Sequence, residues 1–191
     1  MPPVSPATRV RNAAATRSAI LQAARERFAR DSYENVGVRD IASGAGVDAA
    51  LVSRYFGSKE ELFAEVLKSG KRGLDVIGED MDGLPERVAD LLLDQPAEDK
   101  PLDDLLVALH SAGSPQAGHM IRASISERFH VPLAQLLGGE NAELRARVFG
   151  AVLMGMAISQ KVAGEFEIAP EVREPLRARI ADLVRLALSP L

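Results

Sequence analysis

Residues 46–62 read GVDAALVSRYFGSKEEL, and this stretch contains two helix starts about ten residues apart. Asp48 is a favourable N-cap for one helix, and Ser58 opens the Ser-x-x-Glu capping-box pattern of the next. Between them, Gly57 can adopt the positive φ with which many helices end. The stretch therefore predicts a helix of about nine residues, ending near Phe56, which is too short to be stable alone and must be held by packing.

This short helix is expected to have an apolar side and a free side. Val47, Val52 and Phe56 supply inward contacts to the two helices before it, which leaves its opposite side exposed. At about 1.5 Å per residue the helix is roughly 13 Å long, a length that suits a DNA major groove about 12 Å wide. Two short helices joined by a glycine-containing turn, with the second presented outward, form a helix-turn-helix.

Apolar residues recur with helical spacing along almost the whole chain, and no window alternates with period two for long enough to predict a strand. The first helix is expected from about Thr16 to Arg30, the second before Gly46 and the fourth after Ser58. Their apolar stripes are Ile20, Ala23, Ala24 and Phe28; Val38, Ile41, Ala42 and Ala45; and Leu62, Phe63, Val66 and Leu67. These patterns predict an all-α fold.

The composition is that of a globular protein. The chain has 191 residues, of which 47% are hydrophobic, and it has no cysteine for a disulfide or a thiolate metal site. No run approaches the roughly 18 uncharged apolar residues of a membrane span, and the first residues lack the apolar core of a signal peptide. We therefore expect a soluble, cytoplasmic protein with no membrane partner.

The net charge of −4 hides an asymmetry along the chain. Residues 1–60 contain nine Lys and Arg against six Asp and Glu, whereas residues 61–191 contain fourteen against twenty-one. The local electric field follows this distribution rather than the total charge. A basic N-terminal part and an acidic remainder of the chain suggest two surfaces with different partners.

Four short motifs lie in the run from Thr16 to Phe63. They are Ala-Ala-x-x-x-Phe in the first helix, Val-Arg-Asp-Ile-Ala in the second, Ala-Gly-Val before the third and Tyr-Phe-x-Ser-Lys-Glu-x-Leu after it. Together they make the run similar to the N-terminal domain of the TetR family of bacterial transcriptional regulators. The resemblance implies a flexible basic arm over 1–15, a three-helix helix-turn-helix domain over 16–64, and a helical dimerisation and effector-binding domain over 65–191.

The function that this resemblance implies is that of a ligand-responsive repressor. A homodimer would bind a palindromic operator in double-stranded DNA, with the third helix in the major groove, and a small-molecule effector would release it. A helical adaptor that uses the helix-turn-helix for protein contact is the alternative, because a fold does not fix a function. The sequence lacks G-x-S-x-G, G-x-G-x-x-G, Walker and His-Glu-x-x-His motifs, so no enzyme is expected.

The resemblance also implies roles for individual side chains. Tyr55 and Lys59 match positions that usually touch DNA phosphates, and Arg39 matches a position that contacts a phosphate or a base edge. The base-reading residues of the third helix would be Ala49, Ala50, Ser53 and Arg54. The basic arm that can follow the DNA backbone or enter the minor groove contains Arg9, Arg11 and Arg17. Without the resemblance, Tyr55 is equally an aromatic residue at the edge of the core, and Lys59 a solvated first-turn residue.

Four positions depart from the family's pattern. Val36 and Gly37 stand where a Thr or Ser pair often caps the second helix and donates to phosphate. Leu51 replaces a small polar residue, so apolar contact must substitute for a hydrogen bond. Ser32 stands where a glycine usually precedes the aromatic residue of the first turn.

The C-terminal part is expected to contain a long helix from about Pro115, kinked near Pro132, and a final helix pair over 143–164 and 171–188. Small residues recur on the first helix of this pair, at Ala146, Gly150, Ala151, Gly155 and Ala157. Small side chains let another helix approach closely, so the pair is expected to form the dimer interface as a four-helix bundle. The same face can instead pack within one subunit.

The effector site is predicted from polar and titratable residues that lie among adaptable apolar ones. The candidates are His110, His119, Met120, Phe129, Met154 and Gln160. Each also has a plainer explanation, since an isolated His is more often a surface residue and Met more often fills a gap. His110 and His119 are too far apart in sequence to share a tight helical metal site, so no metal or other cofactor is expected.

Overall fold

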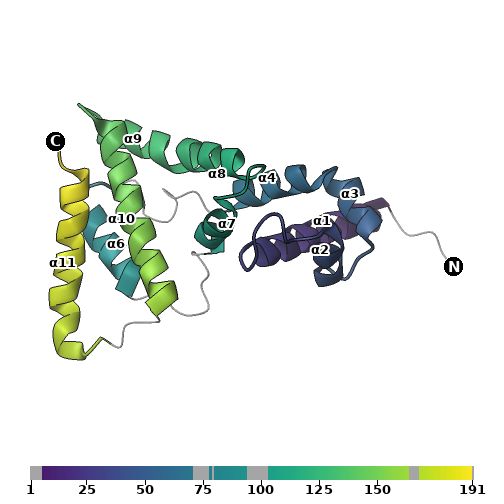
Figure 1. Ribbon diagram of the computed structural model, residues 1–191, viewed down its shortest axis with the longest axis horizontal. Coiled ribbons are helices and arrows are strands. Elements are labelled where there is room, and N and C mark those ends of the chain that lie inside the picture. The colour runs from purple at the N-terminus through teal and green to yellow at the C-terminus, as the bar shows by residue number, and fades with distance from the viewer. Residues whose placement is uncertain (1–5, 71–77, 79, 94–102, 164–167, 191) are drawn as a thin grey trace. The chain divides into compact units, whose positions relative to one another are not determined.

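The computed structural model describes residues 6–70, 78, 80–93, 103–163 and 168–190 (Figure 1). Within these residues the backbone forms helices and turns and no strand, which confirms the predicted all-α fold. None of the described helices is long and apolar enough to cross a membrane. The helices are α1 (Pro6–Phe28), α2 (Val38–Gly44), α3 (Ala49–Phe56), α4 (Lys59–Ser69), α6 (Leu84–Leu93), α7 (Asp103–Ser111), α8 (Gly118–Ile125), the π-helical η1 (Ser126–His130), α9 (Val131–Leu137), α10 (Ala142–Ala163) and α11 (Pro170–Leu188).

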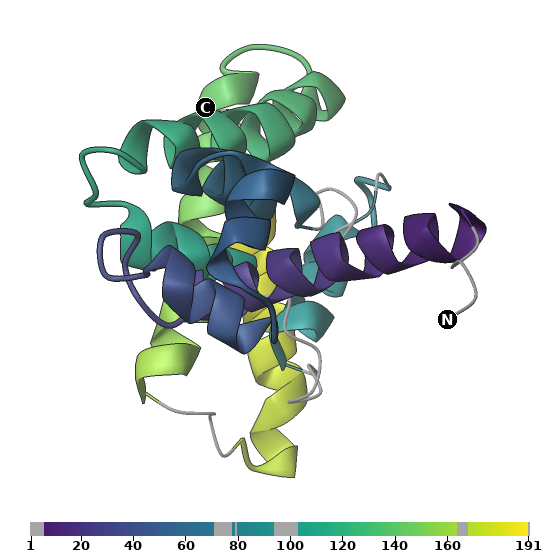
Figure 2. The same cartoon turned by 90° about the vertical axis from the view of Figure 1, so that its right-hand side faces the viewer.

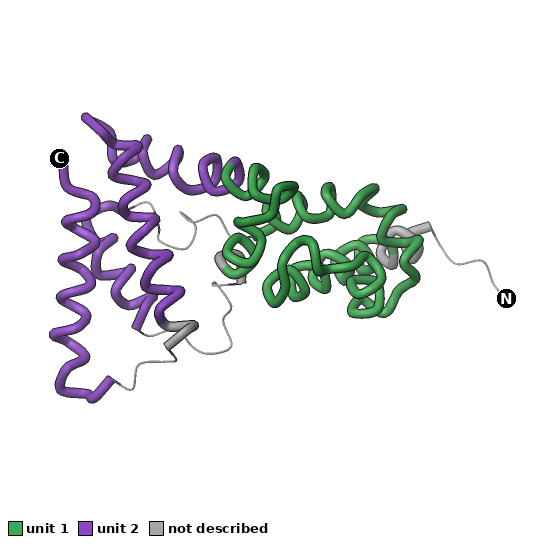
Figure 3. Tube along the Cα trace, in the orientation of Figure 1, with its two compact units in different colours: residues 1–70, 102–122 green, residues 71–101, 123–191 purple. Residues whose placement is uncertain are grey.

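The chain divides into two compact units (Figure 3). Unit 1 contains residues 1–70 and 102–122, and unit 2 contains residues 71–101 and 123–191. The sequence-based boundary after residue 64 assigned α7 to the C-terminal domain, whereas in the structure α7 packs against α1 and belongs to unit 1. A single cut along the sequence therefore does not separate the two units.

The first helix begins at Pro6 rather than at Thr16. Residues 6–15 are thus helical, which corrects the predicted flexible arm for these residues, and residues 1–5 lie outside the described part of the chain. Two local features explain the earlier start. Proline is favoured in the first turn of a helix, and the run Ala13–Ala15 consists of the best helix-forming residue. Figure 2 shows α1 as the long purple helix.

The predicted short helix is present as α3, and its ends are formed as expected. The carboxylate of Asp48 accepts a hydrogen bond from the Ala50 N–H at 2.7 Å. Gly57 ends the helix with a positive φ of 76°. At the start of α4, the Ser58 hydroxyl accepts from the Glu61 N–H at 3.1 Å, and the Glu61 carboxylate accepts from the Ser58 N–H at 2.9 Å. Both predicted helix starts are therefore confirmed.

Three aromatic rings form the centre of unit 1. Phe28 and Phe63 meet edge to face with ring centroids 4.8 Å apart. Tyr33 meets Phe63 edge to face at 5.0 Å and stacks on Phe28 at 6.0 Å. All three side chains are buried. The rings join α1, the turn after it and α4 in one core, against which α2 and α3 pack.

Unit 2 has its own apolar core between α6, α10 and α11. Its largest buried residues include Leu84, Val88, Leu133, Phe149, Ile180 and Val184. At the rim of this core, Arg177 and Arg185 of α11 form ion pairs with carboxylates of α6. The long α10 and α11 therefore have one side in the core of their own unit.

The interruption predicted near Pro132 takes the form of the π-helical turn η1. Val131 donates its N–H to the Ser126 carbonyl, five residues back, which is the π-helical pattern. Pro132 has no N–H and cannot continue the α-helical pattern, so α9 restarts with this proline in its first turn.

We predict that Asp48→Ala opens α3 locally, because the N-terminal N–H groups of a helix this short have no other side-chain cap. Loss of an N-cap costs about 1 kcal/mol, which corresponds to roughly fivefold faster amide exchange in α3. Asp48→Asn is the matched control, since its amide oxygen still accepts the hydrogen bond. Equal exchange rates in Asp48→Ala and the parent protein would show that the cap does not hold α3.

Candidate nucleic-acid interface

The helix α2 is capped without the hydroxyl group that the family's pattern supplies. Gly37 stands at the N-cap and has no side chain to accept a hydrogen bond. Asp40 instead accepts from the Gly37 N–H at 3.1 Å, which is the reciprocal half of a capping box. The turn to α3 is closed by the Val47 N–H, which donates to the Ala42 carbonyl at 3.0 Å. The missing hydroxyl group therefore removes a possible donor to phosphate but does not prevent α2 from starting at Val38.

The two sides of α3 differ in exposure. Val52 and Phe56 are only 2% and 6% exposed, and they pack toward the core of unit 1. Among the predicted DNA contacts, the exposed residues are Arg39, Ala50, Ser53 and Arg54, and the half-buried ones are Ala49, Tyr55 and Lys59. The described residues of unit 1 thus leave the outer side of α3 accessible to a partner.

Lys59, in the first turn of α4, lies on an aromatic ring. Its Nζ is 4.3 Å from the ring centroid of Tyr33, within the range of a cation–π interaction. No sequence pattern links these two residues, because Tyr33 lies in the turn after α1 and Lys59 in the first turn of α4. The only available signal for Tyr33 was an aromatic residue in the turn after the first helix. Tyr33 therefore joins the residues that shape this interface.

Glu60 places a negative charge next to Lys59. The backbone N–H of Glu60 itself, in the first turn of α4, lowers the pKa of its carboxyl group most. The nearby hydroxyl groups of Tyr33 and Ser58 lower this pKa further. Burial is the main cause that raises the pKa of the Tyr33 hydroxyl, and the negative charge of Glu60 raises this pKa further. The Tyr33 hydroxyl and the Glu60 carboxylate do not meet ordinary hydrogen-bond geometry. Glu60 is thus a carboxylate at neutral pH, and it places a negative charge next to the ammonium group of Lys59.

Arg17 has a structural role that the predicted basic arm did not include. It lies within α1, where its guanidinium carbon is 4.7 Å from the ring centroid of Phe56 and its Nη2 is 2.8 Å from the Glu65 carboxylate. Arg17 therefore joins α1 to both α3 and α4. Arg9 and Arg11 lie in the first turns of α1 rather than in a flexible arm.

The predicted effector residues are distributed over both units. His110 and His119 are exposed and Met120 is half-buried in unit 1, whereas Phe129 and Met154 are half-buried in unit 2. Phe129 stacks on the buried Phe149 at 6.0 Å, so it contributes to the core of its unit. The side chain of Gln160 lies outside the described residues. The effector site remains a prediction.

The two short helices α2 and α3, joined by a turn, with α3 buried on one side and exposed on the other, form a helix-turn-helix. Residues 20–66 match the family described as bacterial regulatory proteins, tetR family. Residues 82–188 match the tetracycline repressor-like C-terminal domain, so the two matches together cover most of the chain. The chain belongs to the TetR family and is a DNA-binding transcriptional regulator.

Individual relatives agree with this assignment. The chain is 43% identical over 58 residues to the HTH-type transcriptional regulator BetI of Agrobacterium fabrum, a match that spans 30% of this chain and only 28% of BetI. A TetR-family regulator from Streptomyces coelicolor is 29% identical, with a TM-score of 0.52 and coverage of 93% of this chain and 96% of that one. A transcriptional regulator from Saccharomonospora viridis in complex with choline is 22% identical, with a TM-score of 0.59 and coverage of 88% and 95%, and supports the fold alone.

We predict that Arg17→Ala lowers the free energy of unfolding of unit 1 by about 1 kcal/mol, as expected for a partly exposed ion pair plus a cation–π contact. Glu65→Ala is the control and should cost less, because it leaves the contact with Phe56 in place. Urea unfolding followed by amide signals of α3 and α4 measures both effects. An equal loss in the two variants would show that the Phe56 contact contributes nothing.

Proposed function

We propose that the chain is a repressor that binds a palindromic operator as a homodimer, with α3 in the major groove of each half-site, and that a small-molecule effector releases it. The observation that carries this proposal is the asymmetry of α3, which has Val52 and Phe56 buried while Ser53 and Arg54 are exposed. An α-helix presented in this way fits the major groove.

The proposed contacts divide into two kinds. Lys59, Tyr55 and Arg39 bind phosphates and set the position of the domain on the duplex. Ala49, Ala50, Ser53 and Arg54 approach the base edges, where an arginine can bind guanine through two hydrogen bonds and an alanine can contact a thymine methyl group. Leu51 is half-buried beside them and adds apolar surface.

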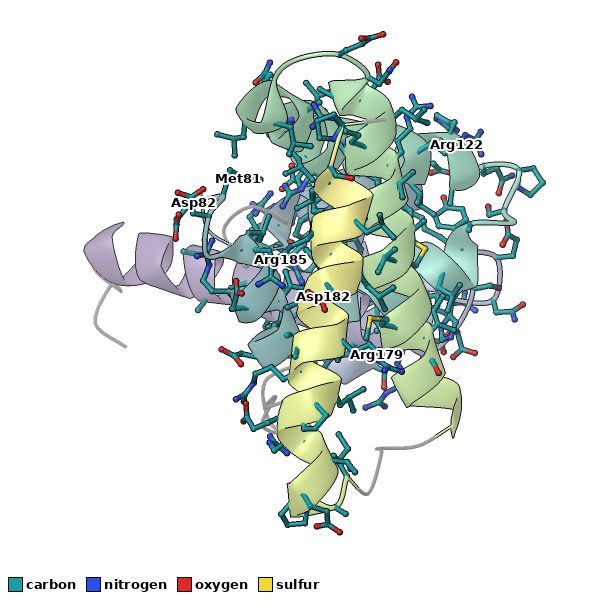
Figure 4. The ribbon with its side chains drawn as sticks, turned by 90° about the vertical axis from the view of Figure 1, so that its left-hand side faces the viewer. Met81, Asp82, Arg122, Arg179, Asp182 and Arg185 are labelled. Atoms are coloured by element: carbon teal, nitrogen blue, oxygen red, sulfur yellow. The ribbon has the colours of Figure 1, made fainter. Side chains whose placement is uncertain are left out.

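The proposed dimer interface is the side of α10 and α11 that faces away from the core of unit 2. Its large apolar residues are exposed: Leu144, Val148, Val172, Leu183 and Leu186. Leu186 alone is 72% exposed. Figure 4 views the unit from the side of α11, where Arg179, Asp182 and Arg185 are labelled on that helix. Apolar side chains at this density on two neighbouring helices are typical of a surface that a partner covers.

Gly155 supports a second copy of α10 as that partner. A glycine inside a helix costs about 1 kcal/mol relative to alanine, so it needs a compensating reason. A Cβ atom added at Gly155 would meet nothing within 4 Å among the described residues. Close approach by a helix from another subunit supplies the reason.

The effector is proposed to be a small organic molecule. Support comes from the Saccharomonospora viridis regulator, which was crystallised with choline and shares this fold. His110, His119, Met120, Phe129, Met154 and Gln160 remain the proposed contacts. Single substitutions at these residues, assayed for effector-induced release from DNA, identify those that take part.

We predict that Lys59→Ala weakens binding to every duplex by about tenfold near 0.1 M salt. The slope of log affinity against log salt concentration should become shallower by about one, because one phosphate contact is lost. Arg54→Ala should instead cost about 1–3 kcal/mol on the operator and little on random DNA. Lys68→Ala, which removes the same charge from the last turn of α4, is the control. Fluorescence titration at several salt concentrations measures these effects. If the parent protein fails to bind any duplex at low salt, the helix-turn-helix serves a protein partner instead.

We predict that the pair Leu183→Glu and Leu186→Glu converts the protein to monomers, because charged groups cannot be buried between apolar helix surfaces. Leu109→Glu is the control, since Leu109 is also an exposed leucine but lies on α7 in unit 1. Analytical ultracentrifugation gives the mass of each variant. A parent protein that sediments as a monomer, or a dimer that survives both substitutions, contradicts the proposed interface.

A further inference from the structure

A buried hydrogen bond joins α7 to the turn after α1. The Ser111 hydroxyl accepts from the backbone N–H of Tyr33 at 3.0 Å, across 78 residues of sequence. Ser111 is completely buried, and Tyr33 is 2% exposed. A buried N–H without an acceptor is strongly disfavoured, so this hydroxyl specifies where the Tyr33 backbone lies.

The position of the Tyr33 backbone determines the position of its ring. Phe28 and Phe63 contact the ring at 6.0 and 5.0 Å between centroids. These neighbours leave the ring little freedom of its own, because a close-packed core resists displacement of a large side chain. A shift of the Tyr33 backbone is therefore transmitted to the ring.

The Tyr33 ring in turn holds Lys59. Nζ lies 4.3 Å from the ring centroid, and an ammonium group over a ring still has N–H donors that point away from it. A lysine side chain loses much rotamer freedom when it binds a phosphate, and one that is already held loses less. The contact with Tyr33 therefore prepares Lys59 for a phosphate.

We propose that Ser111 is a positioning residue for the contact between Lys59 and a DNA phosphate, and that it acts through the backbone and ring of Tyr33. This inference rests on the proposed function, because it assumes that Lys59 binds DNA. It assigns to α7 an indirect part in setting DNA affinity, through Tyr33 and Lys59. The chemistry needed is only a hydroxyl acceptor, an aromatic ring and an ammonium group, all of which lie in unit 1.

Ser111→Ala tests the proposal, and Ser114→Ala is a matched control. Ser114 is 8% exposed, and its hydroxyl accepts from the Ala117 N–H at 2.9 Å, so the control removes an equivalent buried hydrogen bond that does not involve Tyr33. Ser111→Cys fills the site with a slightly larger thiol group that is a weaker acceptor, and it replaces Ser111→Ala if that variant does not fold.

The first measurement needs no DNA. In the parent protein, the NMR signals of the Lys59 ε-methylene group should be shifted by the ring current of Tyr33. Ser111→Ala should move these signals toward the values of a free lysine, and Ser114→Ala should leave them unchanged. Absence of a ring-current shift in the parent protein, or an unchanged shift in Ser111→Ala, overturns the proposal.

The second measurement is binding to random duplex DNA over a range of salt concentrations. Ser111→Ala should weaken binding by about threefold to tenfold and reduce the salt slope, whereas in a Lys59→Ala background it should have almost no further effect. If Ser111→Ala weakens binding equally in the parent protein and in the Lys59→Ala background, Ser111 acts only through stability. That result overturns the role of Ser111 and leaves the proposed function intact. A parent protein that binds no duplex at low salt overturns the proposed function as well.

Discussion

The structure depends on how a helix of eight residues is kept in place. An isolated helix of this length does not persist, so α3 exists only because its inner side is buried and its start is capped. Burial of Val52 and Phe56 contributes on the order of 1.5–3 kcal/mol per side chain, and the Asp48 cap about 1 kcal/mol. The buried residues of α3 thus determine the orientation of its exposed ones, to which the DNA contacts are proposed.

The same core extends to a segment that is distant in sequence. Through Ser111, α7 contributes to the packing around Tyr33, and three of the predicted effector residues, His110, His119 and Met120, lie in the same unit. A ligand that displaced α7 would therefore act on the core that supports α4, with no need for an intermediate element. Coupling of this kind requires two arrangements of the packed core that differ in DNA affinity.

Local features of the fold could be read from the sequence, whereas contacts between distant segments could not. Asp48, Gly57 and Ser58 act on the next few residues, and each behaves as its residue type predicts. The earlier start of α1 was missed because the apolar stripe outweighed the signals from Pro6 and the alanine run. The pairings of Arg17 with Glu65 and of Tyr33 with Ser111 span 48 and 78 residues, and no periodicity encodes them. Arg17, which was assigned to the basic arm by its charge, therefore has contacts with Phe56 and Glu65 that the sequence did not predict.

The charge balance explains why positioning matters in this chain. Residues 1–60 contain nine Lys and Arg against six Asp and Glu, a small positive excess, and Glu60 and Glu61 follow Lys59 at the start of α4. A domain with a large positive excess can bind DNA in many orientations, because counterion release depends on the number of phosphates contacted rather than on their arrangement. In the proposed complex, a phosphate that missed Lys59 would lie closer to a carboxylate, so displacement of the ammonium group would weaken the attraction. The contact of Lys59 with the Tyr33 ring thus bears on where the ammonium group lies relative to these carboxylates, and through that on the strength of the proposed phosphate contact.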